Sequence, residues 1–192
     1  MDPAIDPDSG NLDRLRDLVA GLGGRLVTGG FLAWANPGDV DTMADEVFGV
    51  VREAGLLADG DPRSPAFGRR YQVGDRGYPV SDPRYEVSMP ADADALISLL
   101  WEIDEPAAIE LLATLAGGAA RNRLSHRQRR RYPDDPHDLF AEMASLAGPG
   151  TRWWTNTDLT QWNPITQHTF DAVVVGAGNG IIVTVIALDS GS

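Results

Sequence analysis

Two apolar segments joined by a glycine-rich turn constrain the fold of this chain more than any other feature. Residues 169–175 and 181–188 are rich in β-branched side chains, which favour strands. Asn179-Gly180 lies between them and is typical of the type I′ turn of a β-hairpin. Side chains alternate along a strand, and here both faces are apolar: Ala172 and Val174 lie on one, Val173 and Val175 on the other. We therefore predict a hairpin within a sheet that is covered on both sides.

The glycines of this turn also resemble a nucleotide-binding motif. The segment from Asp171 through Gly176, Gly178 and Gly180 is similar to the fingerprint of flavin- and nicotinamide-binding Rossmann proteins. That motif needs a helix directly after the glycines, inside a βαβ unit of roughly 30 residues. A β-branched run follows Gly180 instead, and twelve residues remain after it. We therefore interpret the glycines as turn residues and expect no cofactor.

Helical spacing of apolar residues predicts what packs on the hairpin. The predicted helices span residues 11–22, 41–54, 92–103, 105–116 and 136–146, with Asn11 capping the first and Asp39 or Asp41 the second. Further strands are predicted at 25–35, at 85–89 and near residue 153, and 58–84 reads as the longest loop. The predicted fold is α+β, with four to five helices packed on an antiparallel sheet. We expect a flexible tail over 1–10 and a single domain over 11–192.

Composition excludes several kinds of chemistry. The chain has no cysteine, and all sixteen of its basic residues are arginine, so thiolate sites, disulfides and lysine Schiff bases are excluded. A net charge of −12 disfavours nucleic acids and anionic membranes and favours a basic partner. The Asp-x-Asp pairs lack calcium-loop spacing, so we predict no metal site. Without cysteine or an uninterrupted apolar span, we expect a cytoplasmic protein with no membrane association.

The tryptophan-rich segment at 152–164 is the most unusual in composition. With the nearby histidine it provides the candidate ligand or interface residues Trp153, Trp154, Asn156, Trp162 and His168. Aromatic walls with a few polar anchors suit a ligand pocket, and tryptophans also anchor protein interfaces. His168 is the best candidate for a general base, although a structural histidine is the simpler interpretation. The tryptophans could equally cover a face of the sheet.

A second candidate site lies in the arginine-rich segment from Arg121 to Arg131. If this segment is helical, four arginines share one face: Arg123, Arg127, Arg130 and Arg131. Such a stripe could bind an anion or an acidic partner. The alternative is a solvated helix neutralised by acidic residues of the same chain.

These observations predict a non-catalytic acidic module that binds a basic protein partner, of the inhibitor, immunity or accessory type. One alternative is a small enzyme or ligand-binding protein with a tryptophan-lined pocket. A weaker alternative is nucleic-acid binding through residues 121–131. A homodimer is a further expectation, because a second copy could cover one face of the hairpin.

Overall fold

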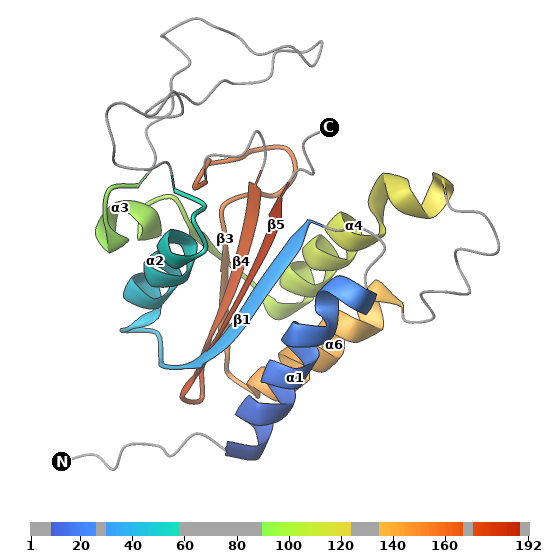
Figure 1. Ribbon diagram of the computed structural model, residues 1–192, viewed down its shortest axis with the longest axis horizontal. Helices are drawn as coiled ribbons and strands as arrows, with labels where there is room; N and C mark the ends of the chain where they lie inside the picture. Colours follow the sequence, from blue (N-terminus) through green and yellow to red (C-terminus); the bar gives the residue numbers. More distant parts are fainter. Residues whose placement is uncertain (1–8, 26–29, 58–89, 124–134, 167–170, 189–192) are drawn as a thin grey trace, which may run out of the picture.

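The computed structural model describes residues 9–25, 30–57, 90–123, 135–166 and 171–188, and it shows a five-stranded antiparallel sheet. The order across the sheet is β1-β5-β4-β3-β2. The strands are β1 (Phe31–Pro37), β2 (Trp101–Ile103), β3 (Arg152–Thr155), β4 (Asp171–Gly178) and β5 (Ile181–Leu188). The predicted α+β fold is therefore confirmed, and β1 and β2 form the two edges of the sheet (Figure 1).

The C-terminal hairpin occupies the middle of the sheet, as predicted. β4 and β5 pair from Asp171 with Leu188 to Gly178 with Ile181. Asn179 and Gly180 have φ angles of 54° and 75°, and a type I′ turn requires positive φ at both positions. A strand, not a helix, follows the glycines, so the structure excludes the dinucleotide-binding arrangement.

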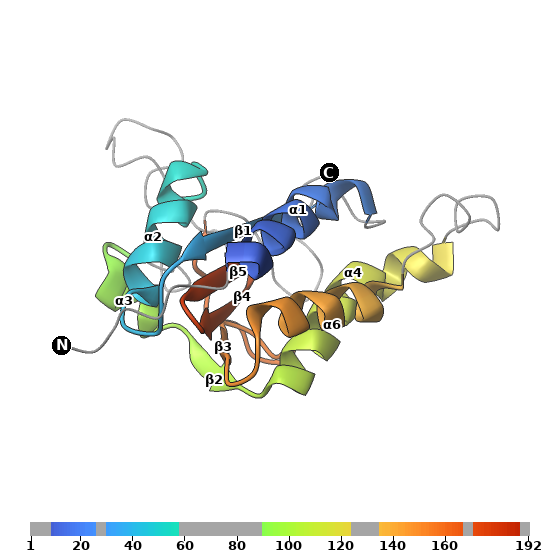
Figure 2. The same cartoon turned by 90° about the horizontal axis from the view of Figure 1, so that it is seen from below.

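Helices cover both faces of the sheet. On one face lie α1 (Ser9–Arg25), α4 (Glu105–Arg123) and α6 (Pro136–Ala147), and on the other lie α2 (Met43–Glu53) and α3 (Ala93–Ile97) (Figures 1 and 2). The hairpin divides its side chains between the two cores as predicted: Ala172 and Val174 face α1, α4 and α6, and Val173 and Val175 face α2 and α3. The second face is thus covered by helices of the same chain.

Gly176 has a packing role that its motif-like sequence does not reveal. It pairs with Trp153 of β3 across the sheet. A Cβ atom at Gly176 would lie 2.7 Å from Cζ3 and 2.8 Å from Cη2 of the Trp153 indole. Because carbon atoms make optimal contacts at about 3.5–4.0 Å, only glycine leaves room for the ring.

Aspartate side chains cap three of the helices. Asp92 accepts a hydrogen bond from the Ala95 amide at the start of α3. Asp104 accepts one from the Ala107 amide at the start of α4. Asp135 accepts one from the amide of the second residue of α6, as its Asp-Pro start signal predicts. These caps place helix starts directly after β2 and before β3, which positions α4 and α6 against the sheet.

Several predicted boundaries were wrong. Asn11 lies inside α1, which begins at Ser9. The cap position of α2 is Thr42, without a side-chain cap bond, and Asp39 instead accepts amide hydrogen bonds within the preceding turn. α4 extends to Arg123, and β1 begins at Phe31. The predicted loop at 58–84 and strand at 85–89 lie outside the described residues.

The predicted helix over 92–103 is divided between two elements. α3 ends at Ile97, and Trp101–Ile103 forms the edge strand β2. Each residue of β2 pairs with one of β3, with Glu102 opposite Trp154 and Ile103 opposite Trp153. The alternating pattern of two apolar residues around Glu102 suits a strand, and pairing with β3 outweighs the helical spacing of the surrounding sequence.

Candidate functional site

Two of the three tryptophans of the predicted pocket, Trp153 and Trp154, lie on opposite faces of the sheet. Successive side chains of a strand point to opposite faces, so Trp153 packs in the α1–α4–α6 core and Trp154 in the α2–α3 core. The Trp153 indole is 2% exposed. The Arg152 guanidinium lies 5.0 Å from the centre of the Trp154 ring and forms two hydrogen bonds with Glu102, of 2.6 and 2.9 Å. These two tryptophans therefore stabilise β3 on its two faces.

Asn156 links the end of β3 to the start of β4. Its side-chain amide donates to Asp171 Oδ1 at 2.6 Å and to the Asn163 carbonyl at 2.9 Å, and its Oδ1 accepts from the Val173 amide at 2.7 Å. The residue is fully buried. All of these partners belong to the protein, so Asn156 acts here as a structural residue of the loop that follows β3.

Asp171 is a buried carboxylate whose role the sequence analysis missed. Besides Asn156, its oxygens accept hydrogen bonds from the Thr166 amide at 2.7 Å, the Thr166 hydroxyl at 2.9 Å and the Ile165 amide at 3.2 Å. The Trp162 indole donates to Oδ1 at 3.4 Å. A buried carboxylate is stable when several donors surround it, and these donors hold residues 162–166 against β4. His168 lies outside the described residues.

Of the arginines proposed as an anion site from the sequence, only Arg123 belongs to the described residues. Arg123 is the last residue of α4, and Arg127, Arg130 and Arg131 lie outside the described residues. Among the described residues, no group of three histidine, aspartate or glutamate side chains is placed to hold a metal ion. None of the described helices is long and apolar enough to cross a membrane.

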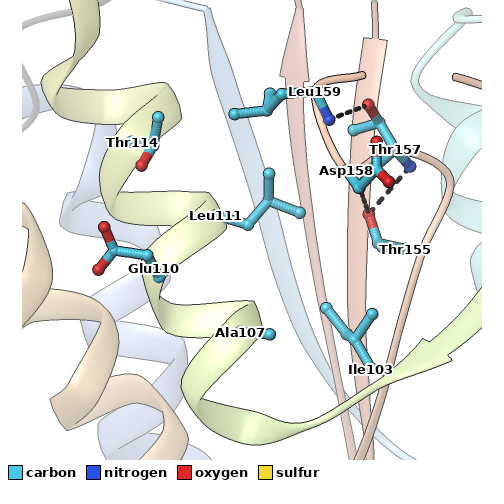
Figure 3. A pocket seen from close by; sticks show the side chains of 9 residues that line it. All are labelled: Ile103, Ala107, Glu110, Leu111, Thr114, Thr155, Thr157, Asp158 and Leu159. Atoms are coloured by element: carbon cyan, nitrogen blue, oxygen red, sulfur yellow. Dashed lines mark hydrogen bonds between the residues drawn. The ribbon is translucent and has the colours of Figure 1, made fainter. Parts of the chain in front are cut away.

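A groove of about 270 Å³ opens between α4 and the loop that follows β3 (Figure 3). Its walls come from β2, α4, the end of β3 and the loop: Ile103, Ala107, Glu110, Leu111, Thr114, Thr155, Thr157, Asp158 and Leu159. Figure 3 shows Leu111 and Leu159 extending toward one another from the two sides. The lining segments are about forty residues apart in the chain and meet because β2 pairs with β3. No local sequence pattern could have indicated this groove.

The loop beside the groove is held by its own hydrogen bonds. Thr155 Oγ1 donates to the Thr157 carbonyl, and Thr157 Oγ1 donates to the Gln161 carbonyl at 2.8 Å. Asp158 Oδ1 accepts from the Thr160 hydroxyl and amide and from the Gln161 amide, all within 2.8 Å. The Thr160 side chain first, and then the two amides, lower the pKa of Asp158, so this carboxylate is ionised at neutral pH.

Leu159 stands out within that loop. It is 49% exposed, although leucine is usually buried. Its φ angle is 71°, in the left-handed region that residues with a Cβ atom rarely adopt. Its amide donates to Thr157 Oγ1, so the loop holds the leucine in this conformation. An exposed apolar residue with a strained backbone is the kind of local exception that clusters at binding sites.

Acidic residues concentrate along the β2 edge of the sheet. Residues 90–116 contain six acidic side chains and no arginine: Asp92, Asp94, Glu102, Asp104, Glu105 and Glu110, which we call the acidic edge. All six are exposed. Figure 2 shows α3, β2 and the start of α4 following one another along this side of the molecule. Glu102 is paired with Arg152, and hydrogen bonding by that arginine lowers the pKa of Glu102.

Comparison of the chain with protein-family models, with curated protein sequences and with solved structures finds no match. The function is therefore inferred from the geometry of this chain.

Proposed function

We propose that this protein is a non-catalytic binding module that recognises a basic protein partner through the acidic edge. The observation that carries the proposal is the run of six exposed acidic residues across α3, β2 and the start of α4, of which Glu102 is paired with Arg152 of β3. Such a surface attracts a positively charged protein and speeds its association. The net charge of −12 adds to this attraction at long range.

The geometry of the polar side chains supports binding over catalysis. The side chains of Asn156 and Asp171 are buried, and their hydrogen bonds hold the loop after β3 in place. A catalytic carboxylate needs access to a substrate, and Asp171 is fully buried. Of the three tryptophans expected to wall a pocket, Trp153 and Trp154 lie on opposite faces of the sheet.

The test is recovery of a partner and measurement of its affinity at two salt concentrations. The immobilised full chain is exposed to an extract of its source cells, and a retained protein is identified and purified. We expect a partner of high isoelectric point whose Kd rises steeply with salt, because the Debye length falls from about 10 Å at 0.1 M to about 3 Å at 1 M. Recovery of no specific protein, or of one whose binding is insensitive to salt, would contradict the proposal.

A matched pair of variants locates the surface. The first, Asp94→Asn/Glu105→Gln/Glu110→Gln, neutralises three members of the acidic edge and leaves the capping residues Asp92 and Asp104 intact. The control neutralises three exposed acids of α1 and α6 that lie outside the acidic edge: Asp17→Asn/Asp138→Asn/Glu142→Gln. The proposal predicts a larger loss of affinity for the first variant, although both change the net charge equally. Equal losses would show that only the net charge matters.

A further inference from the structure

We infer that the groove between α4 and the loop after β3 is the anchor point of the basic partner, and that it receives one large aliphatic or aromatic side chain flanked by arginine or lysine. This inference depends on the proposed function and adds to it a position and a chemistry. Protein interfaces usually depend on a few buried apolar anchors surrounded by polar contacts, and an acidic surface alone provides no such anchor.

The size of the groove suits a side chain better than a cofactor. Small-molecule pockets are typically about 300–1,000 Å³ and enclose most of the ligand, whereas this groove measures about 270 Å³ and is open to solvent. Ile103, Leu111 and Leu159 provide apolar contact surface. The hydroxyls of Thr155 and Thr157 are already bonded to loop carbonyls, so the groove has few polar groups for a polar ligand.

Leu159 provides the second argument. Its side chain lies at the mouth of the groove, nearly half exposed, and its backbone is in the left-handed region. Glycine or asparagine would suit this backbone better, and a polar residue would suit the exposure better. A partner side chain in the groove would cover Leu159, which gives this otherwise unfavourable residue a function.

The charges around the groove define what flanks the anchor. Asp158 and Glu110 line the groove, and Asp104 and Glu105 lie about one and a half turns before Glu110 at the start of α4. In Figure 3 the Glu110 side chain extends from α4 away from Leu111 and Leu159, so its carboxylate lies on the outer side of the helix that walls the groove. Within the described part of the chain, no arginine lines the groove. An apolar anchor flanked by cationic residues therefore matches the apolar walls of the groove, the carboxylate of Asp158 beside it and the acids at the start of α4.

Synthetic peptides can test the inference before the partner is known. We would titrate the isotope-labelled full chain with seven-residue peptides whose central residue is leucine, phenylalanine or alanine and whose neighbours are arginine or aspartate, and follow the amide NMR signals. The arginine-flanked leucine and phenylalanine peptides should shift the signals of Ala107, Leu111, Thr157 and Leu159. Replacing the central residue with alanine should weaken binding about ten-fold or more, because the buried apolar area is lost.

Two variants test the groove directly, with a control for the loss of an exposed leucine. Leu159→Gly removes the apolar wall and suits the backbone angle, so the fold is retained while peptide affinity falls. Ala107→Gln lengthens a side chain on the exposed first turn of α4 and fills the groove. Leu32→Ala removes the other leucine that is exposed in the described part of the chain, on β1, and should leave peptide binding unchanged. Circular dichroism confirms folding in each case.

The outcomes separate this inference from the proposed function. Salt-sensitive binding of the arginine peptides at α3, with no shifts in the groove, would overturn the inference and leave the basic-partner function standing. Equal affinity for the alanine- and leucine-centred peptides would also overturn it. If no arginine-flanked peptide binds anywhere on the chain up to millimolar concentration, the inference and the proposed function both fail.

Discussion

Replacing Gly176 with alanine provides a sharp test of the packing at the centre of the sheet. The new Cβ would lie 2.7–3.0 Å from three atoms of the Trp153 benzo ring. That ring is 2% exposed and surrounded by the core, so it cannot move aside freely. Overpacking of this kind costs roughly 1–3 kcal/mol, and the loss of glycine flexibility in the unfolded chain offsets roughly 0.5–1 kcal/mol of it. We therefore expect a net destabilisation of about 1–2 kcal/mol.

The same substitution at Gly49 serves as the control. Gly49 lies within α2, and a Cβ there would meet no atom within 4 Å. Alanine favours a helix over glycine by about 0.8–1 kcal/mol, so Gly49→Ala should raise stability. The same glycine-to-alanine change is thus predicted to lower the free energy of unfolding at position 176 and to raise it at position 49.

The measurement is urea or thermal unfolding followed by circular dichroism. For a chain of this size, 1 kcal/mol corresponds to a shift in Tm of roughly 2–4 °C. A double-mutant cycle with Trp153→Phe identifies the contact, since phenylalanine lacks the benzo ring of the indole. Phenylalanine also loses no hydrogen bond, because Trp153 Nε1 has no partner within the described residues. Unchanged stability of Gly176→Ala, or an additive cycle, would refute the proposed packing.

Two further predictions concern carboxylates. Asp171→Asn places an amide N–H against the donors of Thr166 and should cost about 2–3 kcal/mol, measured by urea unfolding; a change within experimental error would contradict the assigned network. The pKa values of Glu102 and Asp158 are lowered by their hydrogen bonds in the folded state. Their stabilisation is therefore present above the ordinary carboxyl pKa and is lost as the pH falls through the lowered values. In the Glu102→Gln variant, Tm should therefore fall less between neutral and acidic pH than in the unmodified protein. If Tm varies with pH identically in the two proteins, the pair between Glu102 and Arg152 does not contribute to stability.

The elements that sequence reasoning predicted well have strong local signals. The hairpin combines β-branched runs with Asn179-Gly180, and α6 begins at Asp135-Pro136. The helix predicted over 41–54 from its apolar spacing is α2, and the apolar residues that recur along it are the buried ones: Met43, Val47, Val50 and Val51. In these segments the local preference and the final packing agree, so the pattern alone was sufficient.

The features that were missed depend on contacts between distant segments. Trp101–Ile103 becomes a strand because β3 pairs with it, some fifty residues later in the chain. Asp171 is a lone aspartate before an apolar run, and its donors at Ile165 and Thr166 are identifiable only when the loop is folded. The groove likewise depends on Leu111 and Leu159 meeting across that pairing. Composition indicates an acidic chain, but it cannot indicate a groove whose walls come together only in the fold.

The order of the strands also has a consequence for biosynthesis. The ribosome produces β1, β2 and β3 before β4 and β5, yet the last two occupy the centre of the sheet. Phe31 pairs with Ala187, so β1 has its strand partner only after nearly all of the described chain has been translated. Until then, the apolar faces of the earlier helices remain open to other proteins. The nascent chain is therefore expected to need chaperone protection until β4 and β5 have been synthesised and can join β1 to β3.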